Sequence, residues 1–152
     1  MRVVRTYNSA LIREVICDPA TWAYNDHAPD PATWVPDLHG FTWLALLDGE
    51  PEVLRGLVCA QRRSGCEANV RVAFRPEFRS AKVNVALGRM ACSWLFKEGM
   101  SKLTGVIPSY NINALRYAQR VGFKREGVNR LSISVKKVWY DQTYVGLSAH
   151  DA

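Results

Sequence analysis

The chain has 152 residues, 48% of them hydrophobic, which suits a single domain with one core and leaves no room for a second. Its apolar stretches, such as residues 41–47, are far shorter than the roughly twenty residues that a membrane helix needs. Arg2 and Arg5 lead into polar residues rather than the apolar run of a signal peptide, so we expect a cytoplasmic protein. The net charge of +6 favours acidic partners: a phosphate-bearing cofactor, nucleic acid or an acidic protein surface. The basic residues are spread along the chain without interleaved aromatic residues, which argues against nucleic-acid recognition.

The N-terminal region predicts a strand followed by a helix. Residues 2–7 alternate loosely, as in a strand. Asn8 or Ser9 can cap the helix that follows, and Pro19 ends it near Cys17.

A five-residue repeat, Asp-Pro-Ala-Thr-Trp, comes next, at residues 18–22 and again at 30–34. His27 and His39 follow the two copies at the same offset. An Asp cap before a proline starts a helix efficiently, so each copy predicts a short helical turn.

Three strands joined by short turns are predicted at residues 41–47, 53–61 and 66–75, with turns at Asp48-Gly49 and Ser64-Gly65. The third strand alternates between an apolar side, Cys66, Ala68, Val70, Val72 and Phe74, and a polar side, Glu67, Asn69, Arg71 and Arg75. Together the three strands predict an antiparallel meander.

The second half of the chain predicts two helices and three strands. Pro76 and Phe78 lead into a long helix that Gly99 ends, and its expected apolar face consists of Val83, Leu87, Met90 and Trp94. The remaining elements are strands at 103–107, 128–135 and 138–147 and a helix that begins at Asn111. The fold class is therefore mixed α/β, with a mostly antiparallel sheet of about seven strands and helices on both faces.

The four cysteines lie far apart, mostly in apolar runs, and form no CxxC pair: Cys17, Cys59, Cys66 and Cys92. This pattern predicts buried, reduced thiols rather than disulfides or zinc ligands.

The stretch 111–127 constrains the chain most. Asn111 can cap its helix, Gly122 ends it, and Phe123 begins an extended segment; the apolar face of the helix is Ala114, Leu115, Ala118 and Val121. This arrangement, with Glu126-Gly127 just beyond, resembles the second signature of the GNAT superfamily of acyl-CoA-dependent N-acetyltransferases. The residues 126–130 and 139–144 are similar to the ribosomal-protein alanine acetyltransferases, which acylate protein N-termini.

The resemblance implies acetyl-CoA as acyl donor. In that family a loop at the start of the long helix holds the CoA pyrophosphate through backbone N–H groups, and pantetheine pairs with strand edges. The positions that match are Val72, Phe74, Arg75, Arg79, Ser80, Ala81, Lys82, Asn84 and Asn111, with Val106 and Ile107 on the neighbouring strand. Lys82 and Asn84 depart from the family pattern, which has small residues there, and Asn111 is explained equally well by capping alone.

Acyl transfer to an amine needs a base for the amine and a proton for the departing thiolate. The resemblance implies a glutamate on the fourth strand, for which Glu67 is the best candidate, and the alternative for Glu67 is an ion pair with a neighbouring strand. The family's tyrosine position falls on Ala118, so Tyr117 and Tyr110 are the candidate acids, although a tyrosine at either position is more often a packed aromatic residue with its hydroxyl at the surface.

Trp22, His27, Trp34 and His39 lie where this fold places acceptor-binding helices, so they are candidate substrate-binding residues, although helix-start chemistry explains much of the repeat. No metal-ligand spacing recurs, so we predict no metal site. Three functions follow in order: an N-acetyltransferase acting on a primary amine such as a protein N-terminus, a GNAT-fold domain without catalysis that serves as an interaction module, for example in a viral particle, and a basic nucleic-acid-binding module.

Overall fold

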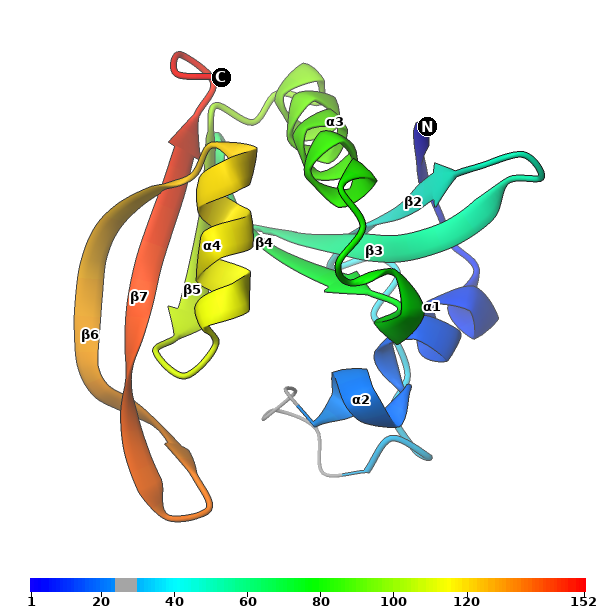
Figure 1. Ribbon diagram of the computed structural model, residues 1–152. Helices are drawn as coiled ribbons and strands as arrows, with labels where there is room; N and C mark the ends of the chain where they lie inside the picture. Colours follow the sequence, from blue (N-terminus) through cyan, green and yellow to red (C-terminus); the bar gives the residue numbers. More distant parts are fainter. Residues whose placement is uncertain (24–29) are drawn as a thin grey trace. The chain divides into compact units, whose positions relative to one another are not determined.

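A computed structural model describes residues 1–23 and 30–152 (Figure 1). The elements are β1 (Arg2–Arg5), α1 (Ser9–Ile16), α2 (Pro19–Trp22), β2 (Thr42–Asp48), β3 (Val53–Arg62), β4 (Glu67–Phe74), the 3-10 turn η1 (Pro76–Phe78), α3 (Val83–Lys97), β5 (Lys102–Pro108), α4 (Ile112–Val121), β6 (Lys124–Val135) and β7 (Val138–Ser148). None of the described helices is long and apolar enough to cross a bilayer.

The sheet has seven strands in the hydrogen-bonded order β1-β2-β3-β4-β5-β7-β6. β4 and β5 run parallel, whereas β1–β2, β2–β3, β5–β7 and β6–β7 are antiparallel. The predicted fold class, a mixed and mostly antiparallel sheet with helices, is confirmed. The chain divides into two compact units: unit 1 is Met1–Gln61 with Arg71–Ala91, and unit 2 is Arg62–Val70 with Cys92–Ala152.

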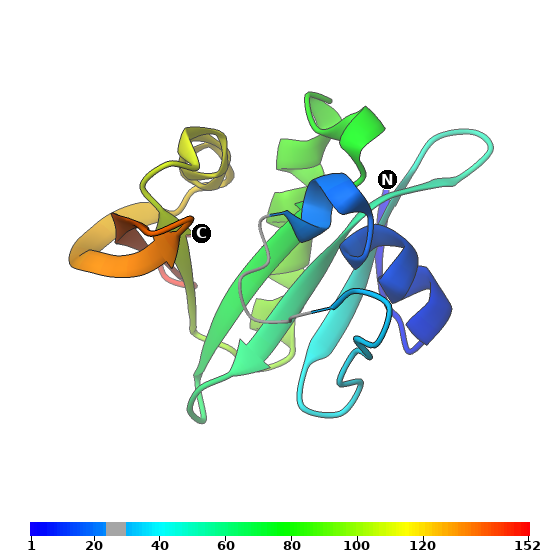
Figure 2. The ribbon, with the colours of Figure 1, turned by 90° about the horizontal axis from the view of Figure 1, so that it is seen from below.

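The core of unit 1 lies where α1 packs on β2 and β3. It consists of Ile12, Val15, Trp43, Ala45 and Leu57, all at most 5% exposed. α1 begins at Asn8, whose side-chain oxygen accepts a hydrogen bond from the N–H of Leu11 at 3.1 Å. Figure 2 shows the start of α3 on the opposite face of these strands, the face on which Leu44 and Leu46 are fully buried.

In unit 2, α4 packs on one face of the strands β5, β7 and β6. Asn111 caps α4, and Gly122 ends it with a φ of 128°, which a residue with a Cβ rarely adopts. A Cβ on Gly122 would lie 3.7 Å from Leu147, so α4 covers the sheet face that buries Leu103, Val145 and Leu147. Lys102 and Thr104 alternate with Leu103 and therefore lie on the opposite face.

The structure corrects the predicted start and face of the long helix. The chain forms η1 after Arg75, and α3 begins at Val83. Met90 is 36% exposed, and the buried positions are instead Asn84, Leu87, Ala91, Cys92 and Leu95. These repeat at helical spacing, and Met90 lies one residue, about 100°, away from Ala91.

Other elements differ in smaller ways. β6 begins at Lys124 rather than 128, because the strand continues through two irregularities that the polar sequence obscured. The first copy of the repeat forms α2, and the second forms one turn, closed by the N–H of Trp34 and the carbonyl of Asp30 at 3.2 Å.

The four cysteines are free thiols, but they are not all buried as predicted. Cys66 is exposed because it lies in the turn before β4. Cys92 is buried on α3, and burial raises the pKa of its thiol to about 12.

Candidate active site

The candidate site residues fall into two groups, one in each unit. Unit 1 contains the loop candidates from Val72 to Asn84 together with Trp22, Trp34 and His39, and unit 2 contains Glu67, Tyr110, Asn111 and Tyr117. His27 lies outside the described residues. Each group is described by itself below.

Arg75 fixes the beginning of the loop that joins β4 to α3. Its N–H donates to the carbonyl of Arg55 at 2.9 Å, and its guanidinium pairs with Glu14 at 2.9 Å and with Glu77 at 3.2 Å. The Arg55 guanidinium lies 4.2 Å from the centre of the Phe78 ring. Arg75 is therefore part of the scaffold that holds the loop.

Asn84 holds the other end of the loop. Its side chain is buried, with 2% of the residue exposed, and its amide donates to the carbonyl oxygens of Phe78 at 2.7 Å and Arg79 at 3.3 Å. These bonds fix the direction of two loop carbonyls. The sequence identified Asn84 as a departure from a small residue, and the structure shows that its side chain packs under the loop.

The middle of the loop presents polar groups at the surface. Arg79, Ser80 and Lys82 are exposed, and Ala81 is half-buried. Arg79 donates to the hydroxyl of Thr21 at 3.2 Å. Because α3 begins at Val83, the N–H of Val83 has no partner within the helix, and among the described residues neither it nor the N–H of Lys82 donates a hydrogen bond.

The strand before the loop presents one apolar side chain to solvent. Val72 is 39% exposed, whereas Phe74 on the same side of β4 is buried. A Cβ on Gly56 of β3 would come within 2.9 Å of the Cα of Phe74 and closer still to the carbonyl oxygen of Ala73. Close approach of β3 thus fixes the end of β4 from which the loop starts.

The structure brings the two repeat tryptophans together. The ring centres of Trp22 and Trp34 lie 6.1 Å apart with an interplanar angle of 67°, and those of Trp34 and Trp43 lie 6.3 Å apart. His39 is at the surface, where its backbone N–H and that of Gly40 donate to the Asp37 carboxylate, the Gly40 bond lowering the pKa of Asp37 most.

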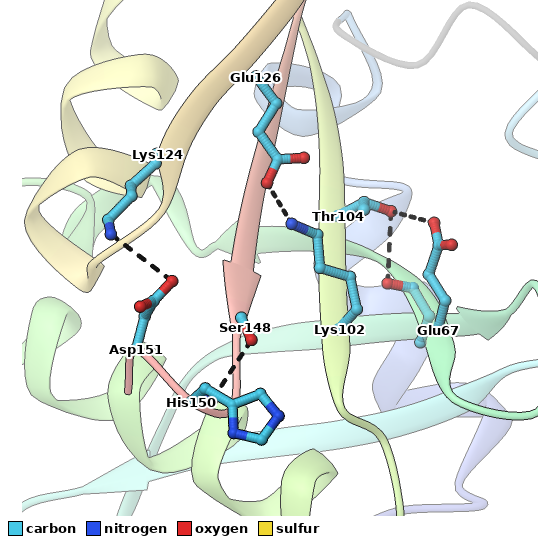
Figure 3. A network of polar contacts seen from close by, with 9 residues as sticks. Glu67, Lys102, Thr104, Lys124, Glu126, Ser148, His150 and Asp151 are labelled. Atoms are coloured by element: carbon cyan, nitrogen blue, oxygen red, sulfur yellow. Dashed lines mark hydrogen bonds and ion pairs between the residues drawn. The ribbon is translucent and has the colours of Figure 1, made fainter.

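In unit 2, Glu67 lies at the start of β4, where it faces Lys102 in the parallel register. Figure 3 shows Thr104 donating to the Glu67 carboxylate at 3.4 Å and Lys102 paired instead with Glu126. Thr104, Lys102 and Glu126 were not predicted. They are 35 residues or more from Glu67, and no local sequence signal could have identified them.

The two candidate tyrosines lie on different faces of the unit 2 sheet. Tyr110 packs edge-on against Tyr140, with ring centres 5.0 Å apart, and Tyr140 lies on the same sheet face as Lys102 by alternation along β7. Tyr117 lies on α4, which covers the other face. Burial, with a smaller contribution from Cys92, raises the pKa of Tyr117, so its hydroxyl stays protonated.

The remaining candidate cofactor-binding residues of unit 2 lie at the start of α4 and on β5. Asn111 accepts a hydrogen bond from the N–H of Ala114 at 3.2 Å, which is a capping contact. Val106, 37% exposed, and Ile107 follow on β5 after the three residues, Lys102 to Thr104, that pair with β4.

Comparison with known proteins agrees with this architecture. Residues 10–123 match the model of the Acetyltransferase (GNAT) family. No curated protein sequence matches significantly. Among solved structures, the spermidine N-acetyltransferase from Vibrio cholerae in complex with CoA and spermine aligns with a TM-score of 0.79 and 13% identity, covering 98% of this chain and 96% of that one.

Two other structures show the same fold. A chimera of the Vibrio cholerae spermidine N-acetyltransferase SpeG and hSSAT has a TM-score of 0.76 and 15% identity, covering 99% of this chain and 97% of that one. A GNAT-family acetyltransferase from Bacillus anthracis has a TM-score of 0.63 and 17% identity, covering 70% and 65%. The family match spans most of the sequence, and the chain therefore belongs to the GNAT family of acetyltransferases.

Proposed function

We propose that the protein transfers an acetyl group from acetyl-CoA to a primary amine. The observation that carries the proposal is the loop between Arg75 and Asn84, which is braced at both ends and ends in helix N–H groups. A helix N-terminus offers donors and a partial positive charge to an anion. The exposed cations of Arg79 and Lys82 add to this charge, so the loop fits a pyrophosphate.

Acetyl-CoA would supply the thioester-bound acetyl group. Backbone N–H groups at residues 80–83, with Arg79, would hold its phosphates. As the resemblance implies, Val72 and Phe74 on β4 would accompany its pantetheine arm. Lys82 is exposed and is not packed into the loop, which supports a contact from its ammonium with phosphate rather than obstruction.

Glu67 is the proposed base. It is half-buried, accepts from Thr104, and lies on the sheet face that α4 leaves uncovered within unit 2. A carboxylate in that position can remove a proton from an ammonium, directly or through water. Tyr110, toward the same face, is the better proton donor for the thiolate, whereas Tyr117 serves packing on α4.

The acceptor is proposed as a primary amine. The Vibrio cholerae structure with CoA and spermine supports an amine of this class. A protein N-terminus remains a prediction from the resemblance of residues 126–130 and 139–144 to the ribosomal-protein alanine acetyltransferases. Trp22 and Trp34 would supply an apolar wall beside the acceptor.

Thermal melting with acetyl-CoA tests donor binding. At about a hundred times its dissociation constant, a specific ligand stabilises the fold by roughly 2.7 kcal/mol, a shift of several degrees. Arg79→Ala is expected to remove most of the shift, whereas Arg62→Ala, an exposed arginine outside the loop, is the matched control and should keep it. No shift at about millimolar acetyl-CoA would contradict the proposal and support the interaction module.

A pair of tyrosine variants tests the proton donor. Tyr110→Phe should lower kcat by about tenfold, less than the roughly 10²–10⁴ typical of acid–base groups, because a thiolate with a pKa near 8.5 leaves with little help. Tyr117→Phe should leave kcat within about twofold and cost about 1 kcal/mol of stability. Steady-state kinetics and urea unfolding of both variants separate the two roles, and the reverse pattern of kcat would assign the donor to α4.

A further inference from the structure

The positive charge of the chain is concentrated in one segment. Residues 111–140 contain seven Lys and Arg and one acidic residue, whereas the rest of the chain contains thirteen of each sign. Basic residues occur throughout the chain, as the sequence suggested. They outnumber the acidic residues only within residues 111–140, because the two signs balance elsewhere. All seven are exposed: Arg116, Arg120, Lys124, Arg125, Arg130, Lys136 and Lys137. A charge asymmetry of this size favours an acidic partner at this segment.

Much of this charge is not neutralised within the protein. Lys124 pairs with Asp151 at 3.5 Å, and Glu126, the acidic residue of the segment, pairs with Lys102 (Figure 3). In the described part of the chain, Arg125, Arg130 and both turn lysines form no ion pair. The charges extend along β6 to its turn with β7, and this hairpin extends past the ends of α4 and β5 (Figure 1).

The two lysines of the turn have a strained backbone conformation, which lowers the stability of the hairpin. Among the described residues, the non-glycine positions with positive φ are Leu131 at 47°, Lys136 at 49° and Lys137 at 65°, all in this hairpin. A two-residue turn of this kind prefers Asn-Gly, because left-handed backbone is costly for a residue with a Cβ. Strained residues of this sort cluster where side chains serve binding.

Apolar side chains are exposed on the same hairpin. Val128 is 42% exposed, Leu131 57%, Val138 51% and Trp139 61%. Leu131 protrudes because Arg130, Leu131 and Ser132 bulge opposite Asp141, whose carboxylate accepts from the N–H of Leu131 at 2.8 Å. The hairpin thus combines unpaired cations with large apolar groups.

We propose that β6 and its turn with β7 form a docking surface for an acidic polypeptide segment that also carries apolar side chains. The phosphates of a nucleic acid would pair with the cations but leave Leu131 and the valines uncovered. A lipid surface would reach the tip, whereas Arg125 and Val128, opposite Val145 and Thr143 of β7, lie along the strand, roughly 20 Å from it at about 3.3 Å per residue. An extended polypeptide covers that length, and β6 is the last strand of the described sheet, so its outer edge can also pair with a backbone.

Fluorescence anisotropy with a labelled peptide tests the surface, and it does not depend on acetyl transfer. The probe is a peptide of about twelve residues in which Glu and Leu alternate, long enough to follow β6. The test variant is Lys136→Asn with Lys137→Gly, which removes two charges and relieves the turn. Its melting temperature should stay equal or rise, while its affinity for the peptide falls by about tenfold. A loss of binding therefore cannot result from unfolding.

The matched control, Arg63→Asn with Lys97→Gln, removes two exposed charges outside the segment and should bind within about twofold of the parent. Leu131→Ser should lower the affinity for the peptide and leave the affinity for single-stranded DNA unchanged. Equal loss in the control variant would show unspecific charge attraction and overturn the proposal. So would tighter binding to a single-stranded oligonucleotide of the same charge, or to phosphatidylserine vesicles, than to the peptide.

Discussion

Glu67→Gln is expected to lower kcat for acetyl transfer by about 10²–10⁴-fold, the range for removing an acid–base group. Glutamine keeps the shape of the side chain and can still accept the hydrogen bond from Thr104, but it cannot take a proton from the amine. The measurement is release of the CoA thiol at saturating amine. Unchanged melting temperature would show that the loss is chemical.

Glu126→Gln is the matched control. Glu126 pairs with Lys102 on the neighbouring strand, so this change removes a surface ion pair of small energetic value and should leave kcat within about twofold. If Glu67→Gln also stayed within about twofold, Glu67 would not be the base.

The pH dependence of the Glu67→Gln deficit also reports on the acceptor. The activity of a variant without its base recovers as the pH rises, because the amine substrate is then already deprotonated in solution and needs no base. Recovery should level off near pH 8 for a protein N-terminus and continue to about pH 10 for a lysine-like or polyamine amine.

Gly56→Ala is expected to destabilise the fold by about 3 kcal/mol or more. Its Cβ would meet the side chain of Phe74 at 2.8 Å and the Cα of Phe74 at 2.9 Å, and the backbone of β4 cannot move without disturbing Arg75 and its two ion pairs. At this size of chain the melting temperature should fall by roughly 6–12 °C.

Gly65→Ala provides the comparison for Gly56→Ala in urea unfolding. Gly65 lies in the turn before β4, and a Cβ there would meet nothing within 4 Å, so the change should stay within about 0.5 kcal/mol. Similar small effects from both substitutions would mean that β3 and β4 separate easily at this point.

Local signals predicted much of the fold. Asn111 and Gly122 fixed the ends of α4 because capping and positive φ are properties of single residues. The start of α3 was less predictable. Pro76 is typical of a first helical turn, but the Asn84 side chain binds the carbonyls of Phe78 and Arg79, six and five residues earlier, and α3 begins only at Val83.

The candidate site was predictable as residue types and not as contacts. Glu67 followed from strand alternation, whereas its partner Thr104 comes from β5, 37 residues later. The sequence could not separate Tyr110 from Tyr117, because the choice depends on which sheet face each approaches. That difference is set by the register of β5 with β7 and by the side that α4 covers.

The amide of Asn84 has a consequence for how tightly an anion could be held. A glycine-rich loop must lose its freedom when a ligand arrives, and that ordering entropy weakens the affinity. Here the side chain restrains the backbone at residues 78 and 79 during folding. The loop is thus preorganised, and a ligand that fits it would bind at a smaller entropic cost than the same ligand would in a flexible, glycine-rich loop.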